Sequence, residues 1–377
     1  MGTYARYDAC IESGSGAVCK DVNGKEYIDF TSGIGVNSLG FADPEWVKAV
    51  SEQAGKLAHI SNLYYTAPGV ALAKALCERT GYSRVFFGNS GAEANEGAIK
   101  TARKYSFDKY GEGRADIVTL VNSFHGRTVT TLAATGQEVF HNYFFPFTEG
   151  FQHVPAGDFA ALQLAAGPSV CAVMLEFVQG EGGVIPLDEG YVKQVADFCK
   201  ERDILLIADE VQTGVGRTGK FLASEHFGVT PDITTLAKGL GGGLPIGAFL
   251  VGEKLKEVMG PSSHGTTFGM NPIVCAGANV VMGRTANEQF LREVTMKGEK
   301  IRACLTCCPE VAGTTGLGLM IGIQLKGKKS GDVAKACLEK GLLVLTAKEK
   351  VRLLPPLTIT DEELSRGLQI LWEVLNS

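Results

Sequence analysis

The sequence predicts an α/β protein: a larger domain with a mainly parallel sheet covered by helices, and a smaller α+β domain. Two observations support this fold class. From about residue 67 to 255, short apolar runs alternate with helical periodicity, which is typical of parallel sheets with helices on both faces. After about residue 270 the pattern changes to longer helices and short strands. A chain of 377 residues is long enough to form two packed cores.

The first expected elements are a β-hairpin over residues 17–30 and a helix after it. The stretch AVCKDVNGKEYIDF alternates apolar and polar residues around Asn23-Gly24, a dipeptide that favours a type I′ turn. Asp43 and Pro44 then predict an N-cap and a first helical turn. The apolar residues at helical spacing in this helix are Val47, Val50, Ala54 and Leu57.

Six apolar runs predict the strands of the larger domain: RVFF, DIVTLV, VCAVMLEF, ILLIAD, DITTLA and IGAFLVG. GYVKQVADFCKERD, between the third and fourth runs, predicts a helix. The C-terminal region then predicts a long helical stretch, a helix near residues 332–340, the short strands LLVL and VRLL, and a closing helix over 361–375. Thr360 and Glu363 predict a capping box at its start. In such a sheet, ligands bind at the carboxyl ends of the strands.

Composition favours small-molecule partners. The net charge of −5 comes from interspersed residues, which argues against nucleic acid or an anionic membrane surface as a partner. Because no run of about 18 apolar residues and no leader-like start occurs, we expect a cytoplasmic protein. The ten cysteines lack framework spacing, which predicts reduced thiols. Cys304, Cys307 and Cys308 include a Cys-x-x-Cys pair but lack a second Cys/His pair, so no metal is expected.

Two candidate ligand-binding features lie at strand ends. In FFGNSGAEANEGAIK, backbone N–H groups at the helix start after Ser90 suit a phosphate, although an ordinary strand-to-helix turn has the same pattern. Asp209 ends the run ILLIAD, where ligands bind, although an acid paired with a helix is the alternative. GVGRTG (214–219) matches a dinucleotide pattern, but five residues separate it from the strand, so nicotinamide binding is not favoured.

The third feature is Lys238, which follows DITTLA and has only apolar residues, threonine and glycines around it from 235 to 247. Desolvation lowers the pKa of such a lysine, so that its neutral amine forms a Schiff base with a carbonyl. Pyridoxal phosphate chemistry requires this lysine, a carboxylate for the pyridine nitrogen and a phosphate cradle. All three are present at predicted strand ends.

Several motifs in one order now carry a resemblance to a known family: YIDFTSGIGVNSLG, NSGAEANEGAIK, SFHGRT, FVQGEGGV, ADEVQTGVGRTG, TTLAKGLGGGLPIGA, GTTFGMNP and VRLLPPL. Over nearly its whole length the chain resembles the class III pyridoxal-phosphate aminotransferases. The resemblance implies a fold-type I pyridoxal 5′-phosphate (PLP) transferase, with a sheet of the seven-stranded type. It also implies that residues 51–270 form the large PLP-binding domain, while residues 1–50 and 271–377 form the small one.

The resemblance also implies the residues that bind the cofactor. Lys238 would be the Schiff-base lysine and the proton-transferring group, and Asp209 would pair with the pyridinium nitrogen. The remaining cofactor contacts would be the phosphate turn of Ser90, Gly91 and Ala92, the ring-sandwiching Phe124 and Val211, Gln212 at the phenolic oxygen, and Thr267. Since Thr267 would reach the phosphate of the neighbouring subunit, the resemblance implies a homodimer with a composite active site.

Substrate binding and the reaction follow from the same resemblance. Arg127 would bind the donor's α-carboxylate, and Arg352 the α-carboxylate of glutamate or 2-oxoglutarate. Glu181 would pair with Arg352 so that one pocket accepts both substrates, and Thr266 is expected at the substrate site. The implied reaction converts N2-acetylornithine and 2-oxoglutarate to N-acetylglutamate 5-semialdehyde and L-glutamate in arginine biosynthesis.

Several alternatives to that reaction remain. Ornithine, succinylornithine, succinyldiaminopimelate or 4-aminobutyrate could replace the donor, because the residues that recognise the acyl group are not identifiable. An aminomutase of the glutamate-semialdehyde type resembles the sequence around Lys238 but lacks FHGRT and DEVQTGVGRTG. A cofactor-binding regulator without turnover is the non-enzymatic alternative.

Overall fold

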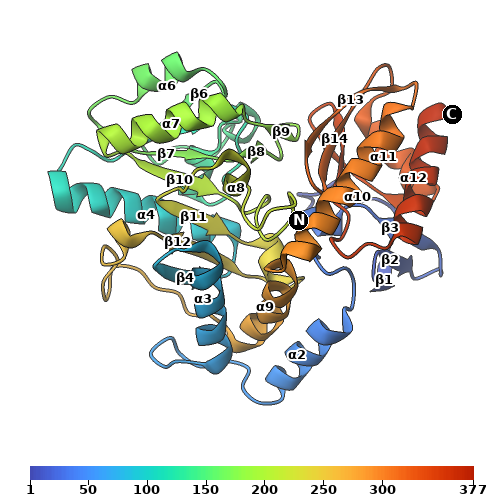
Figure 1. Cartoon of the computed structure of the whole chain (residues 1–377), viewed down its shortest axis with the longest axis horizontal. Helices are drawn as coiled ribbons and strands as arrows, with labels where there is room; N and C mark the ends of the chain where they lie inside the picture. Colours follow the sequence, from blue (N-terminus) through green and yellow to red (C-terminus); the bar gives the residue numbers. More distant parts are fainter.

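A seven-stranded sheet dominates the computed structural model, which describes residues 1–377 (Figure 1). In spatial order its strands are β4 (Arg84–Gly88), β12 (Gly247–Val251), β11 (Ile233–Leu236), β10 (Leu205–Asp209), β7 (Val170–Leu175), β5 (Asp116–Leu120) and β6 (Phe151–Val154). Only β12 is antiparallel to its neighbours; the other pairs are parallel. The predicted mainly parallel sheet is confirmed. The carboxyl ends of β4, β5, β10 and β11 therefore share one edge.

Helices cover both faces of this sheet, as the strand sequences require. Successive residues of β10 face opposite sides: Leu205 and Ile207 pack in the core beneath α4 (Gly91–Tyr110), whereas Leu206 and Ala208 pack beneath α7 (Glu189–Arg202). The second face is completed by α3 (Ala67–Thr80), α6 (Phe159–Ala165) and α9 (Pro272–Thr285). With both faces buried, the inner strands β7 and β12 consist wholly of apolar residues.

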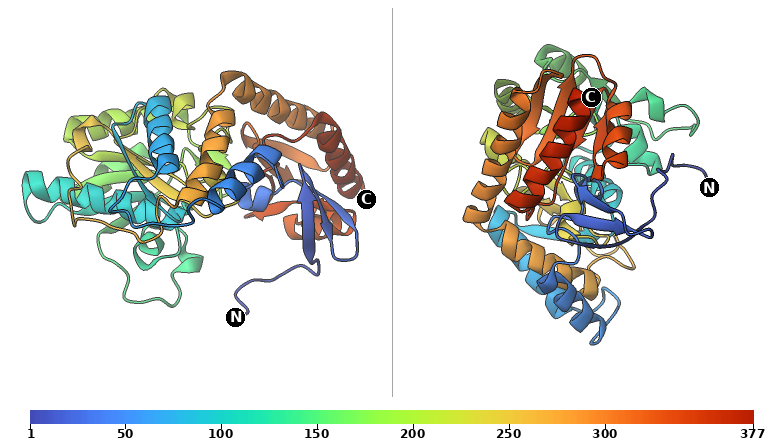
Figure 2. Two further views of the ribbon diagram at one scale, coloured as in Figure 1. Left: turned by 90° about the horizontal axis from the view of Figure 1, so that it is seen from below. Right: turned by 90° about the vertical axis from the view of Figure 1, so that its right-hand side faces the viewer.

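The two ends of the chain form one further core beside the large sheet (Figure 2). Ala17, Ile28 and Phe30 from the N-terminal part pack with residues of the last third of the chain. The N-terminal strands are β1 (Ile11–Ser15), β2 (Val18–Asp21) and β3 (Glu26–Asp29), and β3 pairs in parallel with β15 (Leu342–Leu343). This arrangement agrees with the predicted small α+β part built from both termini.

The second small sheet and its helices complete this part of the molecule. The sheet has the order β13 (Val311–Leu317), β14 (Met320–Leu325), β17 (Lys350–Leu353) and β16 (Leu345–Ala347). The helices are α10 (Glu288–Thr306), α11 (Ser330–Glu339) and α12 (Asp361–Asn376). The division of the chain at residues 50 and 270 stays a prediction, and α2 (Pro44–Ala54) spans residue 50.

Local signals were confirmed with two corrections, the first being that α2 ends at Ala54, before the expected helical residue Leu57. Asp43 caps α2 by accepting N–H bonds from Glu45 and Trp46, both at 3.1 Å. The predicted type I′ turn at Asn23-Gly24 is wrong, because only Gly24 has a positive φ. The carboxylate of Asp21 instead accepts the N–H groups of Asn23 and Lys25, which stabilises a different turn between β2 and β3.

All ten cysteines are free thiols; Cys304 is half-buried, Cys307 exposed and Cys308 buried. No helix combines the length and apolar character needed to cross a bilayer.

Candidate active site

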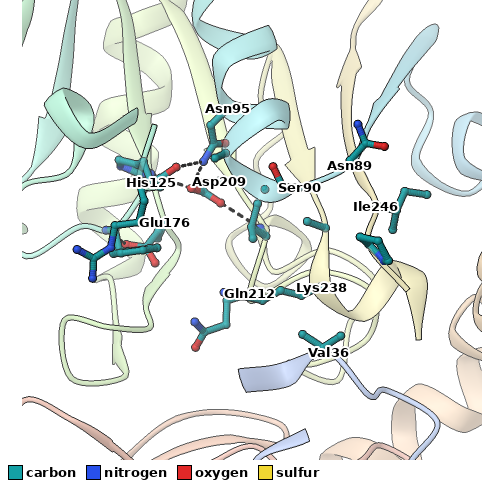
Figure 3. Close-up of a pocket in the computed structure, with 18 of the residues that line it drawn as sticks. Val36, Asn89, Ser90, Asn95, His125, Glu176, Asp209, Gln212, Lys238 and Ile246 are labelled. Atoms are coloured by element: carbon teal, nitrogen blue, oxygen red, sulfur yellow. Dashed lines mark hydrogen bonds and ion pairs between the residues drawn. The ribbon is translucent and has the colours of Figure 1, made fainter. Parts of the chain in front are cut away.

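A cavity of about 450 Å³ opens at the carboxyl edge of the large sheet (Figure 3). The fold brings most of the predicted site residues to it, since they follow β4, β5, β10 and β11. Those lining it are Ser90, Gly91, Ala92, Phe124, Arg127, Asp209, Val211, Gln212 and Lys238. The predicted residues outside its lining are Glu181, Thr266, Thr267 and Arg352.

Lys238 lies two residues beyond β11 and begins a short 3₁₀ helix, η2 (Lys238–Gly241). Its φ of 41° is in the left-handed region, which a non-glycine residue occupies only when its surroundings impose it. Burial lowers the pKa of the Lys238 amine, and the carboxylates of Glu181 and Asp209 oppose that shift. The lysine is therefore held where its neutral form is favoured.

The residue after the lysine explains part of the glycine-rich stretch. Ser38 donates a 3.0 Å hydrogen bond from its hydroxyl to the Gly239 carbonyl, which fixes the backbone beside Lys238. A Cβ at Gly239 would lie 2.6 Å from the Ser38 Oγ. Glycine is therefore required for this close approach.

Asp209, the last residue of β10, is held by three donors. Its Oδ2 accepts hydrogen bonds from Asn95 Nδ2 and His125 Nδ1, each at 2.8 Å, and its Oδ1 accepts the N–H of Val211 at 3.0 Å (Figure 3). Asp209, Asn95 and His125 are all buried. A carboxylate with this many donors cannot rotate freely.

Asn95, His125 and Glu176 are cavity-lining residues that the sequence analysis missed. Glu176 follows the buried strand β7, the same signal that identified Asp209. Its carboxylate accepts the N–H of Phe124 at 3.0 Å and of Gly180 at 3.3 Å. Burial raises the pKa of Glu176; nearby His125 opposes this shift and Asp209 reinforces it. Asn95, polar on the apolar face of α4, was also a usable signal.

The phosphate turn has free donors. Ser90 is the N-cap of α4 and accepts the Glu93 N–H at 3.2 Å, whereas the N–H groups of Gly91 and Ala92 have no acceptor in the chain. A Cβ at Gly91 would lie 2.7 Å from Val211 Cγ1, so glycine lets the helix start approach β10. Two adjacent N–H groups at the start of a long helix suit an anion.

The buried Arg352 and the half-buried Glu181 form an ion pair beside the cavity. Arg352 Nη1 lies 2.6 Å from Glu181 Oε1 and donates to Gln212 Oε1 at 3.3 Å. Burial raises the pKa of Glu181, but the Arg352 guanidinium, together with Lys238 and Gln212, holds that pKa below its ordinary value. Gln212 links this pair to the cavity that contains Lys238.

The two threonines of GTTFG lie in different surroundings. The Thr266 hydroxyl accepts hydrogen bonds from Gly269 N–H at 3.1 Å and Asn89 Nδ2 at 3.3 Å, within its own chain. Thr267 is exposed and makes no hydrogen bond through its side chain. The structure therefore brings neither of them to the lysine of the same subunit.

Comparison with known proteins shows which family has a similar sequence. The family model for class III aminotransferases matches residues 3–375. An acetylornithine aminotransferase from Haemophilus ducreyi is 55% identical, covering 99% of this chain and 95% of the relative.

Solved structures agree in fold. An ornithine aminotransferase from Toxoplasma gondii matches with a TM-score of 0.94 at 33% identity, over 100% of this chain and 92% of that one. An N-acetylornithine aminotransferase from Stenotrophomonas maltophilia has a TM-score of 0.86 at 37% identity, over 99% and 97% of the two chains. This chain is therefore similar over its full length to aminotransferases in both sequence and fold.

Proposed function

The chain belongs to the class III aminotransferases, and we propose that it transfers an amino group from N2-acetylornithine to 2-oxoglutarate, a reaction of arginine biosynthesis. It is a transaminase of fold-type I, and pyridoxal 5′-phosphate is its cofactor. The observation that carries the donor assignment is the 55% identity, over 99% of the chain, to an acetylornithine aminotransferase. Ornithine is the second candidate donor, favoured by the fold match to an ornithine aminotransferase.

The cavity suits this cofactor. The free N–H groups of Gly91 and Ala92 would hold its phosphate, and the fixed Asp209 carboxylate would hold its pyridine nitrogen. Phe124 and Val211 would lie on the two faces of the ring, and Gln212 at its phenolic oxygen. When bound, PLP supplies a reactive aldehyde carbon and an electron-withdrawing ring.

The proposed chemistry of the chain itself centres on Lys238. Since burial lowers its pKa, a larger share of its amine is neutral than in a free lysine, and the neutral amine is the form that acts as a nucleophile and as a base. In this role Lys238 would carry a proton from the donor's amine-bearing carbon to the cofactor in the first stage, and it would carry a proton in the opposite direction in the second stage. Asp209 would keep the pyridine nitrogen protonated, and the Asn95 and His125 bonds would keep the Asp209 carboxylate oriented.

Two arginines would select the substrates. Arg127, at the cavity, would bind the donor's α-carboxylate with its forked N–H groups. Arg352 would bind the α-carboxylate of 2-oxoglutarate or glutamate, but Glu181 occupies it in the structure. Displacement of Glu181 by the second substrate would allow one pocket to serve both stages.

We also propose a homodimer in which Thr267 reaches the neighbouring subunit's phosphate site. Supporting this, Asn62 Nδ2 donates to the carbonyls of Thr266 and Gly269, both at 3.0 Å, and joins two exposed loops into one surface. Leu63, Tyr65 and Phe268 on these loops are 87%, 92% and 62% exposed. Such exposed apolar surface marks an interaction face.

A cytoplasmic location is proposed from the ten free thiols, which fit a reducing compartment.

A substrate panel tests the proposed function. The PLP-loaded protein is mixed in turn with N2-acetylornithine, ornithine and 4-aminobutyrate, first without and then with 2-oxoglutarate. We expect N2-acetylornithine to bleach the visible band of the cofactor and glutamate to form only when 2-oxoglutarate is added. Isomerisation of the amine without 2-oxoglutarate would indicate a mutase instead, and no bleaching with any amine would contradict a transaminase.

A further inference from the structure

Arg127 has an unusual environment for a surface arginine. Its side chain is exposed at the cavity, next to the ring of Phe124. The nearby carboxylates of Asp209 and Glu181 pair with His125 and Arg352 instead, and Arg127 forms no ion pair with any carboxylate of the chain. Its guanidinium N–H groups remain free, and its orientation must come from other contacts.

Phe140 supplies the closest of these contacts. The guanidinium carbon of Arg127 lies 3.7 Å from the centroid of the Phe140 ring and 5.5 Å from that of Phe124. The two rings are 6.0 Å apart and meet edge to face at 82°. An aromatic face attracts the flat guanidinium but uses none of its N–H groups, so the edge of the fork stays available for a carboxylate.

The segment that carries Phe140 is fixed to the turn that carries Arg127. Phe140 ends a 3₁₀ turn, η1 (Glu138–Phe140). Just before it, Gly136 N–H donates to Ser123 Oγ and Gln137 Nε2 donates to the Ser123 carbonyl, both at 3.0 Å. Ser123 directly precedes Phe124, so these bonds fix the position of Phe140 relative to Phe124 and Arg127.

We propose that Phe140 is a positioning residue that orients Arg127 and thereby sets the preference of the site for donors with an α-carboxylate. The inference rests on the proposed function, since it takes Arg127 as the group that binds this carboxylate. Without the Phe140 ring, the long Arg127 side chain samples many rotamers, and binding a carboxylate must then restrict it at an entropic cost.

The test compares two donors that differ only in the α-carboxylate: N2-acetylornithine and N-acetylputrescine. In a two-stage transfer, kcat/KM for the donor reports the donor stage alone. The ratio of kcat/KM for N2-acetylornithine to kcat/KM for N-acetylputrescine therefore measures the preference for a donor with an α-carboxylate. We expect Phe140→Leu to lower this ratio about tenfold, mainly through N2-acetylornithine. Phe140→Tyr, which keeps the ring, should stay within about twofold of the original ratio.

Two further variants separate the possible failures. Phe144→Leu makes the same change at an exposed aromatic of the same loop and should leave the ratio unchanged. Arg127→Gln should abolish the preference. The role of Phe140 is refuted if Phe140→Leu leaves the ratio unchanged or slows both donors equally. The role of Arg127 still holds in that case, provided that Arg127→Gln lowers the ratio. If Arg127→Gln leaves the ratio intact, the proposed role of Arg127 fails as well.

Discussion

The Lys238 amine is placed where the protein solvates charge poorly. Burial lowers its pKa from the ordinary value of 10.5, and the left-handed backbone at this residue adds local strain. Burial favours a neutral nucleophile, and both features oppose folding of the cofactor-free protein. Function and stability therefore conflict at this residue.

Replacement of Lys238 by methionine tests this conflict. Because the folded pKa lies below 10.5, the unfolded chain binds a proton at this amine more tightly than the folded protein does, so protonation favours unfolding at neutral pH. This penalty is largest at low pH and disappears as the pH rises to 10.5. We expect Lys238→Met to lack transaminase activity even with PLP, whereas its cofactor-free form should gain about 1 kcal/mol of unfolding free energy at pH 7 relative to the cofactor-free parent. The gain should shrink near pH 10.

Urea denaturation of the cofactor-free proteins at both pH values measures this effect. Lys48→Met is the matched control, because the Lys48 side chain is 75% exposed and should show no such gain. A Lys238→Met protein that is less stable than the parent at pH 7 would show that the lysine contributes favourable packing instead.

For single residues, the sequence predicts a catalytic role best where the reactive side chain lies at the end of a strand. Asp209 and Lys238 stand out because each follows a short apolar run. The partners of Asp209 do not: Asn95 is 114 residues away in the chain and His125 is 84 away. Only the packing of α4 and the β5 turn against β10 brings them together, and no local pattern encodes that packing.

The start of α12 links the two ends of the chain. Thr360 and Glu363 form the predicted capping box, with Thr360 N–H donating to Glu363 Oε2 at 2.8 Å. The other oxygen of Glu363 accepts the N–H of the buried Ala17 at 3.0 Å. The capping box was predictable from its spacing, but the contact with Ala17 was not, since the two residues are 346 positions apart.

Removal of this carboxylate should therefore cost more than an ordinary cap. Glu363→Ala leaves a buried N–H at Ala17 without its acceptor, and we expect a loss of about 2 to 3 kcal/mol in the free energy of unfolding. Thr360→Ala should lose about 1 kcal/mol. Glu362→Ala, an exposed acid in the same turn, should lose only a few tenths. Equal losses for Glu362→Ala and Glu363→Ala in urea titrations would refute the link to Ala17.

The hairpin between β2 and β3 shows where a local signal fails at the scale of an element. Asn23-Gly24 correctly marked the chain reversal, but a side chain outside the dipeptide decided the turn geometry. The Asp21 carboxylate binds two backbone N–H groups of the turn, which the alternation of apolar and polar residues does not reveal.

At the scale of the whole molecule, a single subunit exposes apolar side chains that a stable isolated protein would bury. Leu63, Tyr65 and Phe268 lie on the two loops joined by Asn62, beside the unpaired hydroxyl of Thr267. The proposed dimer would cover this face and bring Thr267 to the phosphate site of the other subunit. Cofactor binding would then depend on assembly.

Complementation between two defective subunits tests this arrangement. Thr267→Ala should weaken PLP binding about tenfold, because a hydrogen bond to a charged phosphate is lost, and Lys238→Ala should abolish turnover. In a mixed dimer of the two variants, the subunit that keeps Lys238 receives an intact Thr267 from its partner. We therefore expect mixed dimers at limiting PLP to recover activity that neither parent shows, measured after co-refolding of differently tagged chains. If Thr267 served its own subunit, each mixed site would carry a defect, and the mixture would be no more active than the Thr267→Ala dimers it contains.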